Sequence, residues 1–206
     1  MNRFSEANDM NQDSPRPSVT RAWWPVGLLI LAFGLFAVSR NQPSSQDSVA
    51  IGKPAPQLEL VRLSVDPAEM TIETMPTGKV ALIHLWGTWC GPCKMEYPHL
   101  AEMAREFESD DTFEFISISC EGGSAETIEG LAEKTREYLA SIAAPTDVFA
   151  DPRGTTRMNV AERLEKPNMY FPTTILVDRQ GTIRGVWEGY SPSGVEQMKV
   201  EIERWL

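Results

Sequence analysis

Apolar residues form one long stretch near the N-terminus and several shorter stretches after residue 50. The long stretch, residues 22–39 (AWWPVGLLILAFGLFAVS), has no charged residue and lies between Arg21 and Arg40. Eighteen residues are near the lower limit for a helix that crosses a bilayer, and the two tryptophans at its start favour a membrane interface. We expect a transmembrane anchor here. A signal peptide cleaved after the small residues of 37–39 is the alternative.

The segments on either side of the apolar stretch are polar. Residues 1–21 contain few apolar side chains and two prolines, which predicts a disordered tail, and the positions of the flanking arginines favour the cytoplasm for it. Residues 40–50 (RNQPSSQDSVA) are typical of a flexible linker. The folded domain is expected from residue 51 to residue 206.

Within residues 51–206, buried strands alternate with amphipathic helices. Strands are predicted over 79–86, 111–120 and 146–150, followed by a hairpin over 173–189 with its turn at 178–181. Helices are predicted over 92–109, where a proline kinks the helix, and over 124–143, 155–165 and 193–206, with Ser124 as N-cap of the second. This order predicts an α/β domain whose central mixed sheet is parallel in the middle, antiparallel at the edges and flanked by helices.

Composition and charge narrow the class of protein. The net charge is −10, and residues 51–206 carry all of it. An acidic domain without a basic stripe argues against nucleic acid as a partner. Three cysteines are too few for a disulfide scaffold in a chain of 206 residues. The cysteines are therefore candidates for chemistry and not for a structural framework.

Two of the cysteines lie where a strand passes into a helix, in the sequence Cys90-Gly91-Pro92-Cys93. The free N–H groups and the dipole of a helix N-terminus favour a thiolate, which makes Cys90 the candidate nucleophile. Pro92 suits the first helical turn because its missing N–H would be unpaired there. Cys93, one turn into the helix, is the candidate resolving thiol that attacks a mixed disulfide formed on Cys90.

Helical spacing adds a carboxylate to this pair. Leu100, Met103 and Phe107 form an apolar stripe, which extends backwards through Glu96 and Cys93. Glu96 is therefore predicted on the inward face, where burial would raise its pKa and suit it to proton exchange with Cys93. A solvated glutamate in the first turns of the helix is the alternative.

The segment VALIHLWGTWCGPCKMEYPHL (80–100) resembles the active-site segment of the membrane-anchored TlpA/ResA-like thiol-disulfide oxidoreductases, which have a thioredoxin-like fold. The resemblance covers residues 51–206. It includes the opening IGKPAPQLEL, the pattern W-x-T-W-C-x-x-C-x-x-E, the turn DPRG, and FPTTILVDRQG.

The resemblance implies roles for individual residues. Cys90, Cys93 and Glu96 would be catalytic, together with a cis proline that faces the disulfide, here Pro172. The residues expected to contact a client are Trp89, Gly91, Pro92, Phe171 and Thr173. The residues expected to tune the cysteines are His84, Trp86 and Cys120.

The resemblance also implies an activity and a compartment. We expect a membrane-tethered enzyme that reduces selected extracytoplasmic disulfides, because Gly91 and Pro92 resemble the reducing thioredoxins. Maturation of c-type apocytochromes is the best-known use of the family. The expected location is the bacterial cytoplasmic membrane, with the domain in the periplasm. No cofactor beyond the Cys90–Cys93 pair is expected, and the partners are protein thiol clients and a membrane or soluble dithiol donor.

Two features depart from related proteins. His84 stands where cytosolic thioredoxins carry a buried acid, and it is either a core histidine or a proton-handling group that adjusts Cys93. The loop KPNMYF (166–171) is unusually apolar. Met169, Tyr170 and Phe171 therefore form either a partner surface or part of the core.

Two other functions remain as alternatives. Cys90, Cys93, Cys120 and His84 could supply four ligands to a metal, as in a metallochaperone, although their spacing is not that of a zinc site. The opening segment is also shared with peroxiredoxin-like domains, which suggests a peroxidase. Buried packing is the default for Cys120 on its own, with a resolving role as its alternative.

Overall fold

The computed structural model describes residues 47–63, 72–73, 78–123, 125–145 and 147–206. The expected tail 1–21, the expected anchor 22–39 and most of the expected linker lie outside the described residues. Ala50, at the end of that linker, is fully buried in the core, so the folded part includes a residue that the sequence assigns to the linker.

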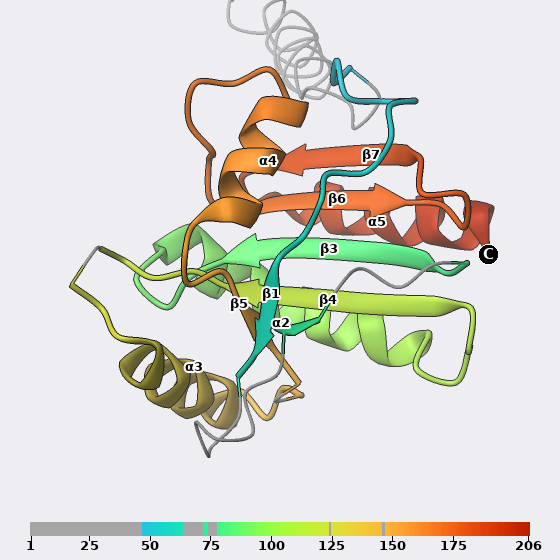
Figure 1. Cartoon of the computed structure of the whole chain (residues 1–206). Coiled ribbons are helices and arrows are strands. Elements are labelled where there is room, and N and C mark those ends of the chain that lie inside the picture. Colours follow the sequence, from blue (N-terminus) through green and yellow to red (C-terminus); the bar gives the residue numbers. More distant parts are fainter. Residues whose placement is uncertain (1–46, 64–71, 74–77, 124, 146) are drawn as a thin grey trace, which may run out of the picture. The chain divides into compact units, whose positions relative to one another are not determined.

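The described strands form one mixed sheet in the order β2-β1-β5-β4-β3-β6-β7 (Figure 1). The central strands β5, β4 and β3 are parallel, and the pairs on either side are antiparallel. This confirms the predicted mixed sheet. The strand bounds are β1 Leu60–Arg62, β2 Ile72–Glu73, β3 Val80–Trp86, β4 Phe113–Ser119, β5 Phe149–Ala150, β6 Thr173–Val177 and β7 Ile183–Glu188.

Strands β1 and β2 were not predicted from the sequence. They contain three and two residues, which is too short for an alternating pattern to stand out. Strand β1 pairs with β5, which is distant in the chain, and β2 pairs with β1. Long-range pairing therefore supports β1, and β1 in turn supports β2.

Helices cover both faces of the sheet (Figure 1). Helices α2 and α5 pack on one face around an apolar cluster that contains Leu82 and Leu176, and α4 packs on the other face with Val160. The helix bounds are α2 Gly91–Glu106, α3 Ile128–Ser141, α4 Thr155–Arg163 and α5 Pro192–Trp205. Each of these four helices in the described part of the chain corresponds to a predicted one.

The start of α3 differs from the prediction. The helix begins at Ile128, and the Thr127 hydroxyl accepts a hydrogen bond from the Gly130 N–H, so Thr127 is the N-cap. The prediction of Ser124 as N-cap is wrong, and Ser124 itself lies outside the described residues. Both are hydroxyl residues suited to an N-cap, and the sequence pattern could not choose between them.

The late hairpin forms as predicted. Strands β6 and β7 pair antiparallel, and the Asp178 carboxylate accepts hydrogen bonds from the backbone N–H groups of Gln180 and Thr182. Gly181 has a φ of +78°, a conformation that glycine adopts without strain. The hairpin brings Pro172, just before β6, beside the carboxyl end of β3.

Candidate active site

The cysteine pair lies at the N-terminus of α2, just beyond the carboxyl end of β3. Cys90 is the N-cap residue, and its sulfur accepts a hydrogen bond from the Cys93 N–H at 3.2 Å. The two cysteines are joined by a disulfide. Both are buried, Cys93 completely, while Gly91 and Pro92 between them are exposed. The strand-to-helix junction thus brings the two sulfurs together at a helix end that favours a thiolate.

Glu96 lies on the inward face of α2, one turn after Cys93. Its side chain is only 1% exposed, and burial raises its pKa from 4.5 to about 8. The predicted inward orientation is confirmed, and the alternative of a solvated glutamate is wrong. The buried face of α2 is wider than the predicted stripe because Tyr97 and Ala101 are buried as well.

His84 lies in the middle of β3 and is completely buried. Its Nδ1 is 2.9 Å from the Thr174 hydroxyl and 3.8 Å from Oε2 of Glu96. Burial lowers the pKa of His84 from 6.5 to about 3, so the imidazole is neutral at physiological pH. The histidine is therefore a core residue in its packing, but it lies beside the one buried carboxyl of the site.

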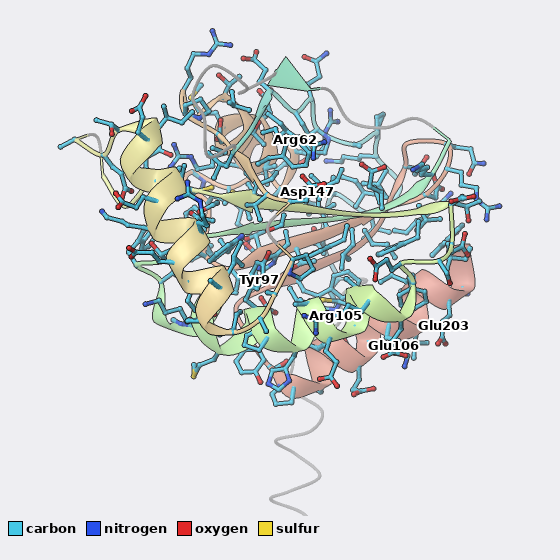
Figure 2. The ribbon with its side chains drawn as sticks, turned by 90° about the horizontal axis from the view of Figure 1, so that it is seen from below. Arg62, Tyr97, Arg105, Glu106, Asp147 and Glu203 are labelled. Atoms are coloured by element: carbon cyan, nitrogen blue, oxygen red, sulfur yellow. A yellow bond between two sulfur atoms is a disulfide. The ribbon has the colours of Figure 1, made fainter. Side chains whose placement is uncertain are left out.

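Buried aromatic side chains pack against the cysteines between α2 and the sheet. Trp86 is fully buried, and its indole N–H donates to the Ser117 hydroxyl at 2.8 Å. The Tyr97 hydroxyl lies 2.8 Å from the same oxygen, and the rings of Trp86 and Tyr97 are 4.3 Å apart. Figure 2 shows Tyr97 where α2 meets the sheet. Trp86, Tyr97, Cys90 and Cys93 belong to one buried cluster, so these rings exclude water from the disulfide.

Sequence reasoning missed Tyr97, Ser117 and Thr174. Tyr97 follows Glu96 directly and does not fall on the predicted stripe. Ser117 and Thr174 occupy the strand positions that pair with His84 in the neighbouring strands. Only the strand pairing identifies the last two.

Trp89 is the exposed aromatic residue beside the disulfide. Half of its side chain is solvent-exposed, yet its indole N–H donates to the Cys120 carbonyl oxygen at 3.0 Å. Its ring meets that of Phe171 edge-on at 5.1 Å. A side chain at Gly87 or Gly122 would collide with the indole, so these glycines are required for its position. Their role was also not apparent from the sequence.

The peptide bond between Phe171 and Pro172 is cis, as the family resemblance implies. Thr173 is fully buried, and its hydroxyl donates to the Tyr170 carbonyl oxygen at 2.7 Å, so its side chain supports the loop instead of facing a client. Met169 and Phe171 pack against the core, whereas Tyr170 is 61% exposed. The loop before Pro172 therefore belongs partly to the core and partly to the surface.

An open hollow of about 400 Å³ lies next to Trp89. It is lined by residues around the end of β4 and the start of α3, among them Gly122, Glu126 and Lys134. Exposed Met95 lies on α2 after the cysteines. Exposed apolar side chains thus occur on the surface around the disulfide.

Cys120 follows β4, and its backbone N–H donates to the Trp86 carbonyl oxygen at 2.8 Å. The side chain is completely buried, and burial raises the pKa of its thiol. The described part of the chain contains no group of three or more histidine, cysteine, aspartate or glutamate side chains suited to hold a metal. The four residues of the metal hypothesis, His84, Cys90, Cys93 and Cys120, form no such group.

The fold and the site together define a class of protein. A disulfide at a strand-to-helix junction, a mixed sheet and a cis proline are the features of a thioredoxin-like thiol-disulfide oxidoreductase. The structure superimposes on that of a thiol:disulfide interchange protein of the thioredoxin family from Chlorobium tepidum, with a TM-score of 0.56 and 17% identity over 74% of this chain and 94% of the other. The thioredoxin domain of a thiol-disulfide oxidoreductase from Bacteroides vulgatus gives a TM-score of 0.56 and 19% identity over 76% of this chain and 98% of that one.

Comparison of the sequence with known proteins identifies the family of this chain. Residues 51–186 match the AhpC/TSA family. The thiol:disulfide interchange protein DsbE of Pseudomonas aeruginosa is 34% identical over 78% of this chain and 79% of its own length. The thiol-disulfide oxidoreductase ResA of Oceanobacillus iheyensis is 27% identical over 79% of this chain and 77% of its own length. The chain therefore belongs to the AhpC/TSA family and, within it, to the thiol-disulfide oxidoreductases related to DsbE and ResA.

Proposed function

We propose that the protein reduces selected disulfides of extracytoplasmic proteins, with Cys90 as nucleophile and Cys93 as resolving thiol. One observation carries the proposal: the pair lies at a helix N-terminus shortly after the buried strand β3, with Cys93 enclosed and the Glu96 carboxyl buried on the same helix face. This arrangement supports attack by Cys90 and protects Cys93 until a mixed disulfide has formed.

The reaction proceeds in two exchanges. The Cys90 thiolate attacks a client disulfide, forms a mixed disulfide and releases the first client thiolate. Cys93 passes its proton to the Glu96 carboxylate and attacks the Cys90 sulfur. The Cys90–Cys93 disulfide then forms, and the second client thiolate leaves. The client gains two electrons that the dithiol loses, and a dithiol donor must restore them.

The proposal also includes the cellular location of the protein. The uncharged stretch 22–39 supports a single-pass anchor in the bacterial cytoplasmic membrane, with the domain on the periplasmic side. The stretch lies outside the described residues. Among the helices that the structure describes, none has the length and apolar character needed to cross a bilayer.

The clients are proposed from chemistry and family resemblance. Exposed Trp89 and Tyr170 near the disulfide favour an extended, partly apolar segment of another protein. The similarity to DsbE and ResA supports a protein disulfide substrate. Apocytochromes c with a C-x-x-C-H haem-attachment motif are the client class that we propose first.

A trapping experiment tests the function. In a Cys93→Ala variant of the full chain the mixed disulfide on Cys90 cannot be resolved, so the client should remain attached and be identifiable by mass spectrometry. A Cys90→Ala variant is the matched control and should trap nothing. An absence of any mixed disulfide in the Cys93→Ala variant would refute the proposal.

The direction of electron flow needs a separate measurement. We expect reversible cycling of Cys90 and Cys93 in a redox titration, followed by the fluorescence of Trp86 and Trp89. The Gly91-Pro92 pair supports a reducing potential close to that of thioredoxin, roughly −270 mV. A potential near −120 mV, typical of a strong oxidant, would reverse the proposed direction.

A peroxidase is the second candidate, and the match to the AhpC/TSA family is the observation that favours it. A peroxidatic reaction would use one cysteine, so peroxide consumption would survive in the Cys93→Ala variant. We expect no such consumption, because the enclosed Cys93 and buried Glu96 serve a two-cysteine exchange.

A further inference from the structure

A row of four side chains with polar atoms crosses the sheet beneath α2. Strand pairing places Ser117 of β4 beside His84 of β3, and His84 beside Thr174 of β6. Thr174 in turn pairs with Trp187 of β7. All four residues are buried, although the neighbouring positions on this face hold apolar residues. Ser117 has its partners in Trp86 and Tyr97, and Trp187 belongs to the apolar cluster. The member of the row that still needs an explanation is His84 with its partner Thr174.

His84 is the residue of this row that lies close to Glu96 of the active site. The imidazole Nδ1 is 2.9 Å from the Thr174 hydroxyl and 3.8 Å from Oε2 of Glu96. Neither that oxygen nor His84 Nε2 has a hydrogen-bond partner within the described residues. Buried polar atoms nearly always have a partner, and exceptions often mark reactive sites. At 3.8 Å the carboxyl and Nδ1 are close but not hydrogen-bonded, so a bond between them requires the carboxyl to approach.

We propose that His84 is a positioning residue for Glu96: its imidazole, fixed by Thr174, bonds the carboxyl in both protonation states and keeps it able to exchange a proton near neutral pH. This inference rests on the proposed function, in which Glu96 takes the proton of Cys93. It assigns a role to His84, which lies outside the C-x-x-C segment, and to the Thr174 hydroxyl that contacts it.

The chemistry of imidazole explains how one side chain serves both states. A neutral imidazole has one acceptor and one donor nitrogen, and the two exchange by tautomerism. As an acceptor, Nδ1 bonds the carboxylic acid; as a donor, it bonds the carboxylate. Nδ1 serves both partners in turn: its N–H can be shared between the Thr174 oxygen and the carboxylate, whereas its single lone pair accepts from the carboxylic acid only when the Thr174 hydroxyl gives up that position. Because hydrogen bonds to an ionised group are the stronger ones, His84 favours the carboxylate and opposes the effect of burial.

No ionised group competes with this pair among the described side chains around it. Tyr97 on α2 lies 5.8 Å from His84 between ring centroids, and Tyr138 on α3 contacts Tyr97. Burial raises the pKa of both tyrosines, so both stay neutral. Cys93 is the other titratable group. The side chains from β4, β6, β7 and α5 on this face do not ionise near neutral pH: Phe115, Ser117, Thr174, Trp187, Val195 and Met198.

Loss of the imidazole has a defined consequence. Without a donor for its carboxylate, Glu96 holds its proton more firmly and is a poorer base for Cys93. The step that suffers is resolution, in which Cys93 loses its proton, the Cys93–Cys90 bond forms and the bond from Cys90 to the client breaks. Attack by Cys90 on the client disulfide does not use Glu96 and is unaffected.

The test measures the resolving step in the reduced full chain after mixing with oxidised glutathione, by rapid acid quench and mass spectrometry across a range of pH. His84→Leu should slow decay of the mixed disulfide about fivefold at neutral pH, the equivalent of one hydrogen bond, and move the pH profile upward. His84→Asn should retain the parent profile, because its amide lies near the Nδ1 position and both donates and accepts.

Two further comparisons separate positioning from packing. In a Glu96→Gln background, His84→Leu should cause no additional slowing, because it acts through the carboxyl. Thr174→Val should resemble His84→Leu in part. The matched control is Thr135→Val, which removes another buried hydroxyl, one that pairs with Ser119 at 2.7 Å. The control should leave the pH profile unchanged.

The outcomes that overturn the inference are distinct from those that refute the proposed function. An unchanged profile in His84→Leu, or equal slowing with and without Glu96, removes the positioning role while Cys90–Cys93 exchange persists. If His84→Leu does not fold, the comparison between Thr174→Val and Thr135→Val decides, and equal profiles in those two overturn the inference. A parent chain that forms no mixed disulfide refutes the function itself.

Discussion

At the scale of single residues, burial controls the chemistry of the site. The same interior raises the pKa of Glu96 to about 8 and lowers that of His84 to about 3, so both side chains are neutral at pH 7 although each is ionisable. Desolvation disfavours whichever form is charged, which is why an acid and a base shift in opposite directions. At pH 7 most Glu96 side chains therefore hold a proton, and the smaller carboxylate fraction is the form that accepts a proton from Cys93 in the proposed reaction.

Replacement of Glu96 by Gln should stabilise the protein at alkaline pH. The pKa of Glu96 rises from 4.5 to about 8 on folding, so the folded state keeps a proton that the unfolded state loses in this range. The free energy of unfolding of the parent therefore falls as the pH rises above 4.5 and levels off beyond about 8. The variant lacks this fall and should exceed the parent at the upper end by on the order of 5 kcal/mol, because each pKa unit of the shift corresponds to about 1.4 kcal/mol.

Urea unfolding of the oxidised protein at about pH 5 and about pH 8 measures this effect. Glu102→Gln is the matched control, since Glu102 is an exposed glutamate on the same helix. It should follow the parent at both pH values. If the free energy of unfolding changed equally between the two pH values in the parent and in Glu96→Gln, Glu96 would not be a buried, protonated carboxyl.

At the scale of elements, the loop after β4 supports the exposed face of the site. This loop supplies the Cys120 carbonyl that accepts the Trp89 indole N–H, and it supplies Gly122 beneath the ring. A second loop, which ends at cis Pro172, supplies Phe171 against the edge of the same ring. Two loops that are distant in the chain therefore fix the aromatic side chain next to Cys90.

Gly122→Ala should displace Trp89. The added Cβ would lie 2.8 Å from Cδ1 of the indole, which is closer than carbon atoms approach. The ring should move outward and lose its hydrogen bond to Cys120, with a red shift in fluorescence. Reduction of a protein disulfide should slow about fivefold, the equivalent of one hydrogen bond.

Gly123→Ala is the matched control, because a Cβ there meets nothing within 4 Å. It should leave both the fluorescence and the rate as in the parent. A Gly122→Ala protein with the parent spectrum and rate would mean that the position of Trp89 does not matter for client reduction.

At the scale of the whole molecule, charge and the apolar stretch separate two functions of the chain. The net charge of −10 belongs to residues 51–206 and keeps the catalytic part soluble. The uncharged stretch 22–39 supports the proposed attachment to a membrane. The exchange chemistry lies entirely in described residues of the domain, so attachment should affect location and not the cysteine chemistry.

Deletion of residues 22–39 should move the protein from the membrane pellet to the soluble fraction, because no comparable apolar stretch follows in the sequence. Exchange between the Cys90–Cys93 pair and a small dithiol should be unchanged. Deletion of residues 2–21 is the control and should leave the protein in the pellet. A mature chain that begins just after Ser39 would establish a cleaved signal peptide in place of the anchor.

The sequence by itself determined the local features of this protein. The order of strands and helices from β3 onward, the mixed sheet, the cysteine pair at a helix start and the inward orientation of Glu96 all follow from periodicity and helix-end chemistry within a few turns of chain. The roles of those residues in catalysis stay predictions until the variants are measured. Of the site residues implied by the family resemblance, Pro172 has the expected cis peptide bond. Thr173, which was expected to contact a client, is buried.

Tertiary structure alone decided which distant residues meet. The pairing of β3 with β4 and β6 brings Ser117 and Thr174 to His84, and the packing of α2 sets Glu96 3.8 Å from the same imidazole. Strand β1, which pairs with β5, and Gly122, which lies against Trp89, depend in the same way on contacts between segments far apart in the chain. The N-cap of α3 is a local contact between Thr127 and Gly130. Periodicity in a sequence reports which face a residue occupies, but only strand register and helix packing determine its neighbours on that face.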